Sequence, residues 1–240
     1  MTTLPRMRSQ KIDSIRGFAI FGMILFHAHY MLIHIFGYTS LDTYRLSWYI
    51  FWRIVAITFI TLAGISYRLQ VTHKLRSTLI KTSIKRALLL SSIAFLISTV
   101  TFVWFHEQRI VFGIIHFFAL STLIAPFFLR FWSWNIALGV GIFFLQPLLE
   151  NISITNILLI PFWIIHGDFY SADYYPLIPW FWYFLVGYGI MNLLEGNVTF
   201  LAWLQKKWKW MAWVAWIGKR SLWAYVIHVP LLYIIFTLFL

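Results

Sequence analysis

Apolar segments long enough to cross a lipid bilayer follow one another along almost the whole chain. A spanning helix needs about 20 predominantly apolar residues. The segments that fit lie at 12–36, 48–69, 87–105, 109–130, 133–149, 176–195 and 220–240. The sequence is 61% hydrophobic and 11% charged, whereas soluble domains average about 25% charged residues. Lipid is therefore the expected solvent, and we predict an all-α, polytopic transmembrane bundle of about seven spans, forming a single domain over residues 1–240.

Basic residues are concentrated at the ends of these apolar segments, and the formal net charge is +12. Lys and Arg accumulate in the cytoplasmic loops of membrane proteins, so the basic stretch 68–86 is predicted to be cytoplasmic, together with the N-terminus. Because the charge follows membrane topology, we do not expect nucleic acid as a partner. We expect a multi-pass protein of a prokaryotic plasma membrane, with homodimer formation left open.

Two segments do not fit the pattern of full spans. The stretch 150–175 contains a short apolar run interrupted by Pro161, which favours a re-entrant or interfacial piece. That interpretation places Lys207 on the cytoplasmic side, the same side as Lys74. The stretch 198–217 mixes Trp and Lys at helical spacing. It predicts an amphipathic helix on the inner membrane surface, with a tilted extra span as the alternative.

The first span carries two ionisable side chains, Arg16 and His27, eleven residues apart. Ionisable residues at membrane depth are costly, so they usually face a partner or a cavity and mark a site. Since a helix rises about 1.5 Å per residue, His27 lies about 16 Å beyond Arg16, in the outer half of the membrane. The same reasoning predicts a similar depth for His116 in its own span, and a place nearer the middle of the last span for His228.

Two further polar residues are predicted to lie near the outer face. Arg53 lies close to the outer end of the second span, and Asp173 lies in the outer loop before the sixth. Two imidazoles, a guanidinium and a carboxylate could therefore converge in the outer leaflet, while basic groups ring the inner mouth. Each of these groups could instead have a purely structural role. A lone histidine can hydrogen-bond a neighbouring helix, Arg16 can extend its guanidinium to headgroups, and Arg53 can pair with Asp173.

Several kinds of chemistry have no residues to support them. The chain contains no cysteine, which excludes disulfides, thiolate catalysis and cysteine-ligated metals. Its histidines show neither HxxxH nor HExxH spacing, so we expect no metal cofactor.

Five segments of the chain, in order, resemble known membrane acyltransferases. The first, DSIRGFAIFGMILFH, resembles the first helix of the acyltransferase-3 group, which shares an R-x10-H pattern that Arg16 and His27 match. RIVAITFITLAGISYRL, FGIIHFFALS and DYYPLIPWFWYFLVGYGI resemble the heparan-alpha-glucosaminide N-acetyltransferase catalytic-domain family. IGKRSLWAYVIHVPLL resembles the last helix of both groups. The spacing R-x10-H is weak evidence by itself, but the ordered set of five covers nearly the whole chain.

The resemblance implies a helical membrane enzyme that takes an acyl group, usually acetyl, from cytosolic acyl-CoA. The acceptor it implies is a sugar or other hydroxyl or amine on the other side of the membrane. His27 matches the histidine regarded as catalytic in the acyltransferase-3 group. A lysosomal enzyme of the closer family places its histidine slightly later, in the first lumenal loop, and by that comparison His29 and His34 are the nearest candidates here.

The residues suit this chemistry. A neutral imidazole can act as a base for the acceptor O–H or N–H, or as a nucleophile that carries the acyl group. Arg53 or protonated His116 could stabilise the oxyanion. We therefore predict a catalytic set of His27, His116, Arg53 and Asp173. The phosphates of CoA suit basic side chains, and we assign to the donor site Arg16, Arg68, Arg86 and His228.

Two other classes of protein remain in competition. A small transporter or flippase would line a pathway with the same polar residues, but its hallmark is a pair of broken helices in matching halves. Pro161 offers one such break, and no repeat pairs with it. A structural or assembly protein would leave His27, His116 and Arg53 without a purpose. Acyl-CoA binding or hydrolysis would separate an enzyme from both alternatives.

Overall fold

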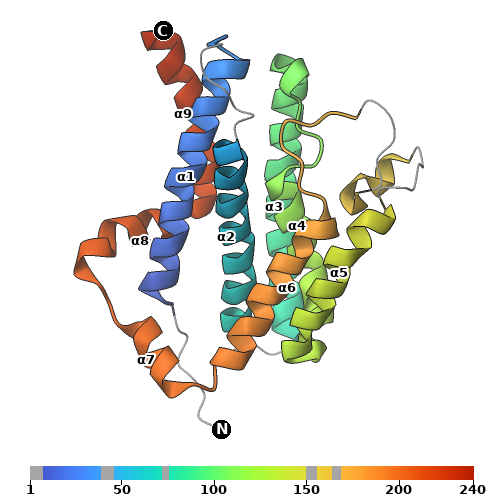
Figure 1. Ribbon diagram of the computed structural model, residues 1–240, viewed down its shortest axis with the longest axis vertical. Coiled ribbons are helices and arrows are strands. Elements are labelled where there is room, and N and C mark those ends of the chain that lie inside the picture. The colour runs from blue at the N-terminus through green and yellow to red at the C-terminus, as the bar shows by residue number, and fades with distance from the viewer. Residues whose placement is uncertain (1–7, 39–45, 72–75, 150–155, 164–168) are drawn as a thin grey trace. The chain divides into compact units, whose positions relative to one another are not determined.

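The structure, a computed structural model, describes residues 8–38, 46–71, 76–149, 156–163 and 169–240. Within these residues the chain forms helices, turns and short extended segments, with one isolated bridge between Phe112 and Tyr174 (Figure 1). The expectation of an all-α fold is confirmed.

The helices have the following bounds. The α-helices are α1 Gln10–His34, α2 Leu46–Val71, α3 Arg76–Trp104, α4 Ile114–Phe128, α5 Asn135–Leu149, α6 Leu177–Leu194, α7 Val198–Gln205, α8 Ala212–Lys219 and α9 Ser221–Phe239. Short 3-10 helices lie between them: η1 His106–Gln108, η2 Leu129–Trp134, η3 Ile157–Phe162 and η4 Lys209–Met211.

Six helical stretches of the described residues are long and apolar enough to cross a membrane. They are 10–34, 46–71, 76–104, 114–149, 177–194 and 221–239. Many of their large apolar side chains are exposed, among them Phe95 on α3 and Leu238 on α9, each at 73%. Apolar surface of this extent is stable against lipid and not against water, so the chain is a membrane protein.

The expected count of about 7 spans is not confirmed. The predicted spans 109–130 and 133–149 fall into a single helical stretch, within which the chain turns back at η2 (Figure 1). Trp132 has a φ of 49° there, and the Asn135 side chain donates to the carbonyls of Phe128 and Trp132 at 2.9 and 2.8 Å. The helices on either side, α4 and α5, have 15 residues each. At about 22 Å they are shorter than the hydrocarbon core of about 30 Å.

The predicted amphipathic helix over 198–217 is instead two helices of eight residues each, α7 and α8. The break at Trp208 is held by the side chain of Gln10, which donates to the Trp208 carbonyl at 3.1 Å and accepts from its N–H at 2.9 Å. An eight-residue helix is about 12 Å long, so neither piece is a candidate span. Of the predicted re-entrant segment, residues 150–155 and 164–168 lie outside the described residues, and η3 with Pro161 lies between them.

The chain divides into two compact units. The central unit comprises Met1–Arg6 and Ala63–Leu193, and the terminal unit comprises Met7–Leu62 and Leu194–Leu240. The first of these ranges lies outside the described residues, and α2 contributes to both units. The single domain over 1–240 stays a prediction.

In the terminal unit, α8 packs closely against the first half of α1 (Figure 1). Gly218 lies beside Asp13, and Val214 lies beside Gly17. The two helices therefore run antiparallel. A Cβ atom added to Gly218 would meet the backbone carbonyl of Asp13, so glycine is what lets the two backbones touch, as small residues do in membrane helix pairs.

This crossing makes a stability prediction. Gly218→Ala should lower the free energy of unfolding by about 1–3 kcal/mol, because the methyl group must push α1 and α8 apart. Gly141 on α5 is the matched control, since a Cβ there would meet nothing within 4 Å, and alanine in an open helical position is neutral or favourable. Thermal unfolding of the two purified variants in one detergent compares them. Equal midpoints would show that the α1–α8 contact is not tight.

In the central unit, α3 packs on α4, and α5 packs on α6. A Cβ atom added to Gly139 of α5 would lie 3.0 Å from the carbonyl oxygen of Trp182 on α6. Phe117 of α4 and Leu185 of α6 are almost completely buried. The segment before α4 and the segment before α6 are joined by backbone hydrogen bonds, Ala172 N to Arg109 O and Tyr175 N to Phe112 O.

Candidate functional site

Two histidines from opposite ends of the sequence meet inside the terminal unit. His27 on α1 and His228 on α9 have ring centroids 4.8 Å apart, with the rings inclined at 71°. Just beyond the end of α1, nine residues after His27, Phe36 contacts Tyr233 and Phe236, which lie five and eight residues after His228. The two helices therefore run side by side in the same direction, which is why residues 201 positions apart in sequence share one level.

The hydrogen bonds of this histidine pair fix where the ring protons lie. The Nδ1 atom of His27 lies 2.9 Å from the Met23 carbonyl, and Nδ1 of His228 lies 2.6 Å from the Tyr225 carbonyl. A carbonyl oxygen can only accept, so Nδ1 of each ring carries a proton and donates it. In the neutral form, both rings then present the lone pair of Nε2, the atom that acts as a base or a nucleophile.

The burial of His228 separates it from an ordinary surface histidine. The residue is 4% exposed, and its Nε2 atom has no hydrogen-bond partner among the described residues. Buried polar atoms are almost always hydrogen-bonded, so an unpartnered one calls for an explanation. A substrate group or a proton shared with His27 would supply the missing partner.

The other two histidines near the end of α1 pack on aromatic rings. His29 stacks on Trp48 of α2 with a centroid distance of 4.1 Å, and His34 lies 4.3 Å from the ring of Tyr30. The Nε2 atom of His29 is also buried without a hydrogen-bond partner among the described residues. His27 instead faces a second imidazole, that of His228, at a centroid distance of 4.8 Å, and this pairing makes it the strongest candidate of the three.

Arg16 is held by a buried carboxylate. Its Nη1 atom lies 3.0 Å from Oδ1 of Asp13, and Nε of Arg8 lies 2.8 Å from Oδ2 of the same residue. The Asp13 side chain is 4% exposed and that of Arg16 is 18% exposed. A buried carboxylate that binds two guanidinium groups fixes their positions, so Arg16 is a positioned cation and not a freely extended one.

His116 and Asp173, both predicted for the catalytic set, lie together in the central unit at the start of α4. Nδ1 of His116 accepts from the Gly113 N–H at 3.1 Å, and Nε2 lies 3.2 Å from the hydroxyl of Ser98. A carboxylate oxygen of Asp173 accepts from the Ile114 N–H at 2.9 Å. Both residues thereby satisfy backbone donors at a helix N-terminus. This gives each a structural role, and their part in catalysis stays a prediction.

The remaining predicted residues lie at separate places. Arg53 is exposed on α2 in the terminal unit, with its guanidinium 4.6 Å from the ring of Tyr49. In the central unit, the Arg68 guanidinium lies 5.7 Å from the ring of Tyr188, and Arg86 is exposed on α3. The predicted convergence of His27 with His116 and of Arg53 with Asp173 joins residues of different units, and it stays a prediction.

Sequence reasoning missed two buried charges at the start of α1. Asp13 precedes Arg16 by three residues, a helical spacing that favours an ion pair and could have revealed it. Lys11 is 3% exposed, and its ammonium lies 3.6 and 4.4 Å from the ring centroids of Trp203 and Trp208. Lys11 and these tryptophans are far apart in the sequence, so no local pattern could have predicted their contact.

No group of three or more His, Cys, Asp or Glu side chains that could hold a metal ion occurs within the described part of the chain. Comparison with protein families shows which family the chain resembles. The family model described as "Heparan-alpha-glucosaminide N-acetyltransferase, catalytic" matches residues 8–230. No curated protein and no solved structure matches the chain.

Proposed function

Because the chain belongs to the heparan-alpha-glucosaminide N-acetyltransferase catalytic-domain family, we propose that it transfers an acyl group, acetyl in the first instance, from cytosolic acyl-CoA. The proposed acceptor is a hydroxyl or amine of a carbohydrate-like molecule at the outer side of the membrane. The proposed place is a prokaryotic plasma membrane with the N-terminus in the cytoplasm. The six apolar stretches support a membrane enzyme, and the basic stretch 68–86 supports the orientation.

The observation that carries the proposal is the pair of Nε2 lone pairs at His27 and His228. In a direct transfer, Nε2 of His27 removes the proton from the acceptor O–H or N–H as that atom attacks the thioester carbonyl. The C–S bond then breaks, and the CoA thiolate leaves and takes up a proton. In a two-step transfer, Nε2 attacks the carbonyl first, the C–S bond breaks and the CoA thiolate leaves, and the imidazole carries the acyl group until the acceptor displaces it and gives up its proton. Both routes need a neutral imidazole with a free Nε2.

His228 has a place in either route. Its ring lies 4.8 Å from that of His27, and its Nε2 is buried without a hydrogen-bond partner among the described residues. It can receive the proton that His27 collects, or hold the acceptor group in line. His228 is therefore proposed as a member of the catalytic pair and not of the donor site, and Arg53 and His116 are proposed to stabilise the oxyanion.

Arg16 supports the donor side of the proposal. It lies eleven residues before His27 on the same helix, so about 16 Å separates the two along the axis. An extended acyl-CoA could contact Arg16 with its phosphate-bearing part and His27 with its thioester. Asp13 holds the guanidinium in place for such a contact, and Arg68 and Arg86 remain proposed phosphate ligands. A transporter is not favoured, because the family is one of transferases.

The test of the donor site is thermal stabilisation of the purified protein. A ligand at 100 times its dissociation constant stabilises the folded state by about 2.7 kcal/mol. We expect acetyl-CoA to raise the unfolding midpoint, dephospho-acetyl-CoA to raise it less, and acetyl-pantetheine, which has no phosphate, to raise it least. Arg16→Gln should reduce the difference between acetyl-CoA and acetyl-pantetheine.

Arg130→Gln is the control for that variant, because Arg130 lies at η2 and is not a proposed donor ligand. It should leave the three midpoints in the same order and at the same spacing. Equal stabilisation of the unmodified protein by acetyl-CoA and acetyl-pantetheine would remove the role proposed for the basic residues.

A further inference from the structure

The last part of the chain carries cations without any carboxylate to balance them. From Gly196 to Leu240 there are five Lys or Arg residues and neither Asp nor Glu. All five are exposed: Lys206, Lys207, Lys209, Lys219 and Arg220. Between Trp203 and Arg220, four tryptophans are exposed as well: Trp203, Trp210, Trp213 and Trp216. These nine residues are called the basic tryptophan surface below.

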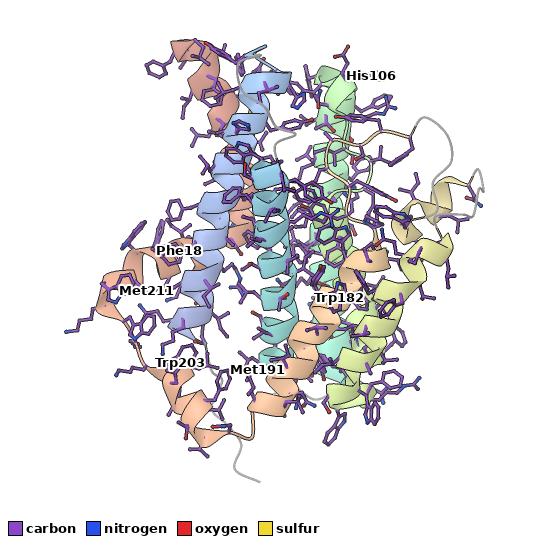
Figure 2. All side chains as sticks on the ribbon, in the orientation of Figure 1. Phe18, His106, Trp182, Met191, Trp203 and Met211 are labelled. Carbon is purple, nitrogen blue, oxygen red and sulfur yellow. The ribbon has the colours of Figure 1, made fainter. Side chains whose placement is uncertain are left out.

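The apolar inner side of this segment is already occupied, which leaves the basic tryptophan surface facing outward. Leu204, Met211 and Val214 are buried, and Ser9 of the α1 N-terminus donates to the Leu204 carbonyl at 2.8 Å. Figure 2 labels Trp203 on α7, Met211 before α8 and Phe18 on α1. The segment is therefore anchored on the terminal unit by its inner residues. One side of Trp203 packs on Lys11 and one side of Trp213 on Phe21, yet the two tryptophans remain 47% and 61% exposed.

Contacts with α1 show which part of that helix, polar or apolar, lies beside each end of α8. Arg16 is the last Asp, Glu, Lys or Arg residue of α1, so the apolar part of the helix begins at Gly17. Gly218, next to Lys219, lies beside Asp13 on the polar part. The ring of Trp213 lies 5.6 Å from that of Phe21 on the apolar part. Lys219, at one end of α8, therefore lies beside the polar part of α1. Trp213, at the other end, lies about one helical turn into the apolar part.

The break between α7 and α8 lies at the polar start of α1. Trp208 is hydrogen-bonded to Gln10 at the polar start of α1, and Lys207 and Lys209 flank it in sequence. Tryptophan is the side chain that prefers the boundary between headgroups and acyl chains, and lysine near a membrane end extends toward the headgroups. At α8, the cation Lys219 lies beside the polar part of α1 and the indole of Trp213 beside the apolar part, an order that matches the two layers of a lipid leaflet.

We propose that the basic tryptophan surface binds the headgroups of anionic phospholipids, so that the terminal unit collects these lipids around α7 and α8. Charge complementarity supports this partner, because basic residues near an anionic leaflet are attracted to its headgroups. This proposal does not depend on acyl transfer. It concerns a surface that carries neither His27 nor His228.

The experiment places one fluorescent label beside the surface in a chain that has no cysteine of its own. Ala202→Cys, at an exposed position of α7, carries the donor dye, and the protein is placed in nanodiscs of phosphatidylcholine with a few headgroup-labelled acceptor lipids. Energy transfer is compared for labelled phosphatidylglycerol and labelled phosphatidylcholine at the same density. We expect a local preference for phosphatidylglycerol of about twofold to fivefold.

Two variants with equal loss of charge decide whether the surface is responsible. Lys206→Gln/Lys207→Gln should abolish most of the preference at position 202. Lys81→Gln/Lys85→Gln, which removes two exposed lysines from α3 of the central unit, should keep it. An equal loss in both variants would mean that the preference follows net charge, and the proposal would be overturned. So would equal energy transfer from the two lipids to the unmodified surface.

A salt titration tests the same proposal without any substitution at the lysines. The Debye length falls from about 30 Å at 0.01 M to about 3 Å at 1 M salt, so the preference for phosphatidylglycerol should be lost over that range. A preference that is unchanged at 1 M salt would show that charge does not select the lipid.

Discussion

His27→Ala is expected to lower the rate of acyl transfer about 10²–10⁴-fold, the usual effect of losing a general base. Acetyl-CoA should still raise the thermal midpoint of this variant, because the proposed phosphate ligands are Arg16, Arg68 and Arg86 and not His27. The physical reason is the ring geometry, in which Nδ1 donates to Met23 and leaves the Nε2 lone pair for the substrate. Turnover of acetyl-CoA with a carbohydrate acceptor and thermal stabilisation by acetyl-CoA measure the two effects separately.

His29→Ala is the matched control, because the residue lies two positions along the same helix and stacks on Trp48. It should keep turnover within a few-fold of the unmodified protein. The opposite result would be informative as well. Near-normal turnover in His27→Ala, together with a dead His34→Ala, would mean that the later histidine expected from the closer family is the catalytic one.

His228→Gln is expected to lower turnover about 10²-fold, at the lower end of the range for acid–base groups. Glutamine keeps a polar side chain of similar reach in a position that is 4% exposed, but it offers no basic nitrogen to the proton held by His27. The rate constant at saturating acetyl-CoA should fall, while the concentration for half-saturation should change little. A role in donor binding, the original prediction for this residue, would give the reverse pattern.

A double variant tests whether the two histidines act as one unit. The loss in His27→Ala/His228→Gln should be about as large as in His27→Ala alone, because residues of one catalytic unit are not additive. A lower unfolding midpoint in His228→Gln with normal turnover would show instead a histidine that serves the packing of α1 and α9. Losses that multiply would show two independent roles.

The secondary structure was largely predictable because lipid makes strong demands on a chain. A backbone in hydrocarbon must satisfy its own hydrogen bonds, and helices do so within one segment. The first, second and sixth predicted spans agree closely with α1, α2 and α6. The region 109–149 was less predictable, since hydropathy measures apolar character and does not detect the turn at Trp132, which depends on the side chain of Asn135.

The segment 198–217 shows a second limit. Its Trp and Lys pattern predicts an amphipathic helix, and the structure has a break at Trp208 that is held by Gln10. These residues are 198 positions apart. Sequence periodicity is a local property. The helical spacing of Trp and Lys is therefore unchanged even where a side chain distant in sequence interrupts the helix.

The candidate site was predictable in part. The depth argument identified His27 as a polar group with a purpose, and the resemblance to acyltransferases supported it. The sequence could not place His228 beside it, because helix depth does not say which helices are neighbours. The sequence also did not reveal that the ring nitrogens of His116 form hydrogen bonds with Gly113 and Ser98 at the start of α4. Contacts at the start of a helix depend on tertiary structure.

The central claim is that acyl transfer takes place at the Nε2 atoms of His27 and His228. A cryo-electron microscopy map of the purified protein with a non-hydrolysable acetyl-CoA analogue tests this most directly. In the two-step route, the carbonyl carbon that replaces the thioester should lie about 3–3.5 Å from Nε2 of His27, a distance from which attack can begin. In the direct route it should lie beside the same atom, with room for the acceptor group between them. A well-ordered analogue with that carbon beside His34 or His116, and with no histidine pair near it, would contradict the account.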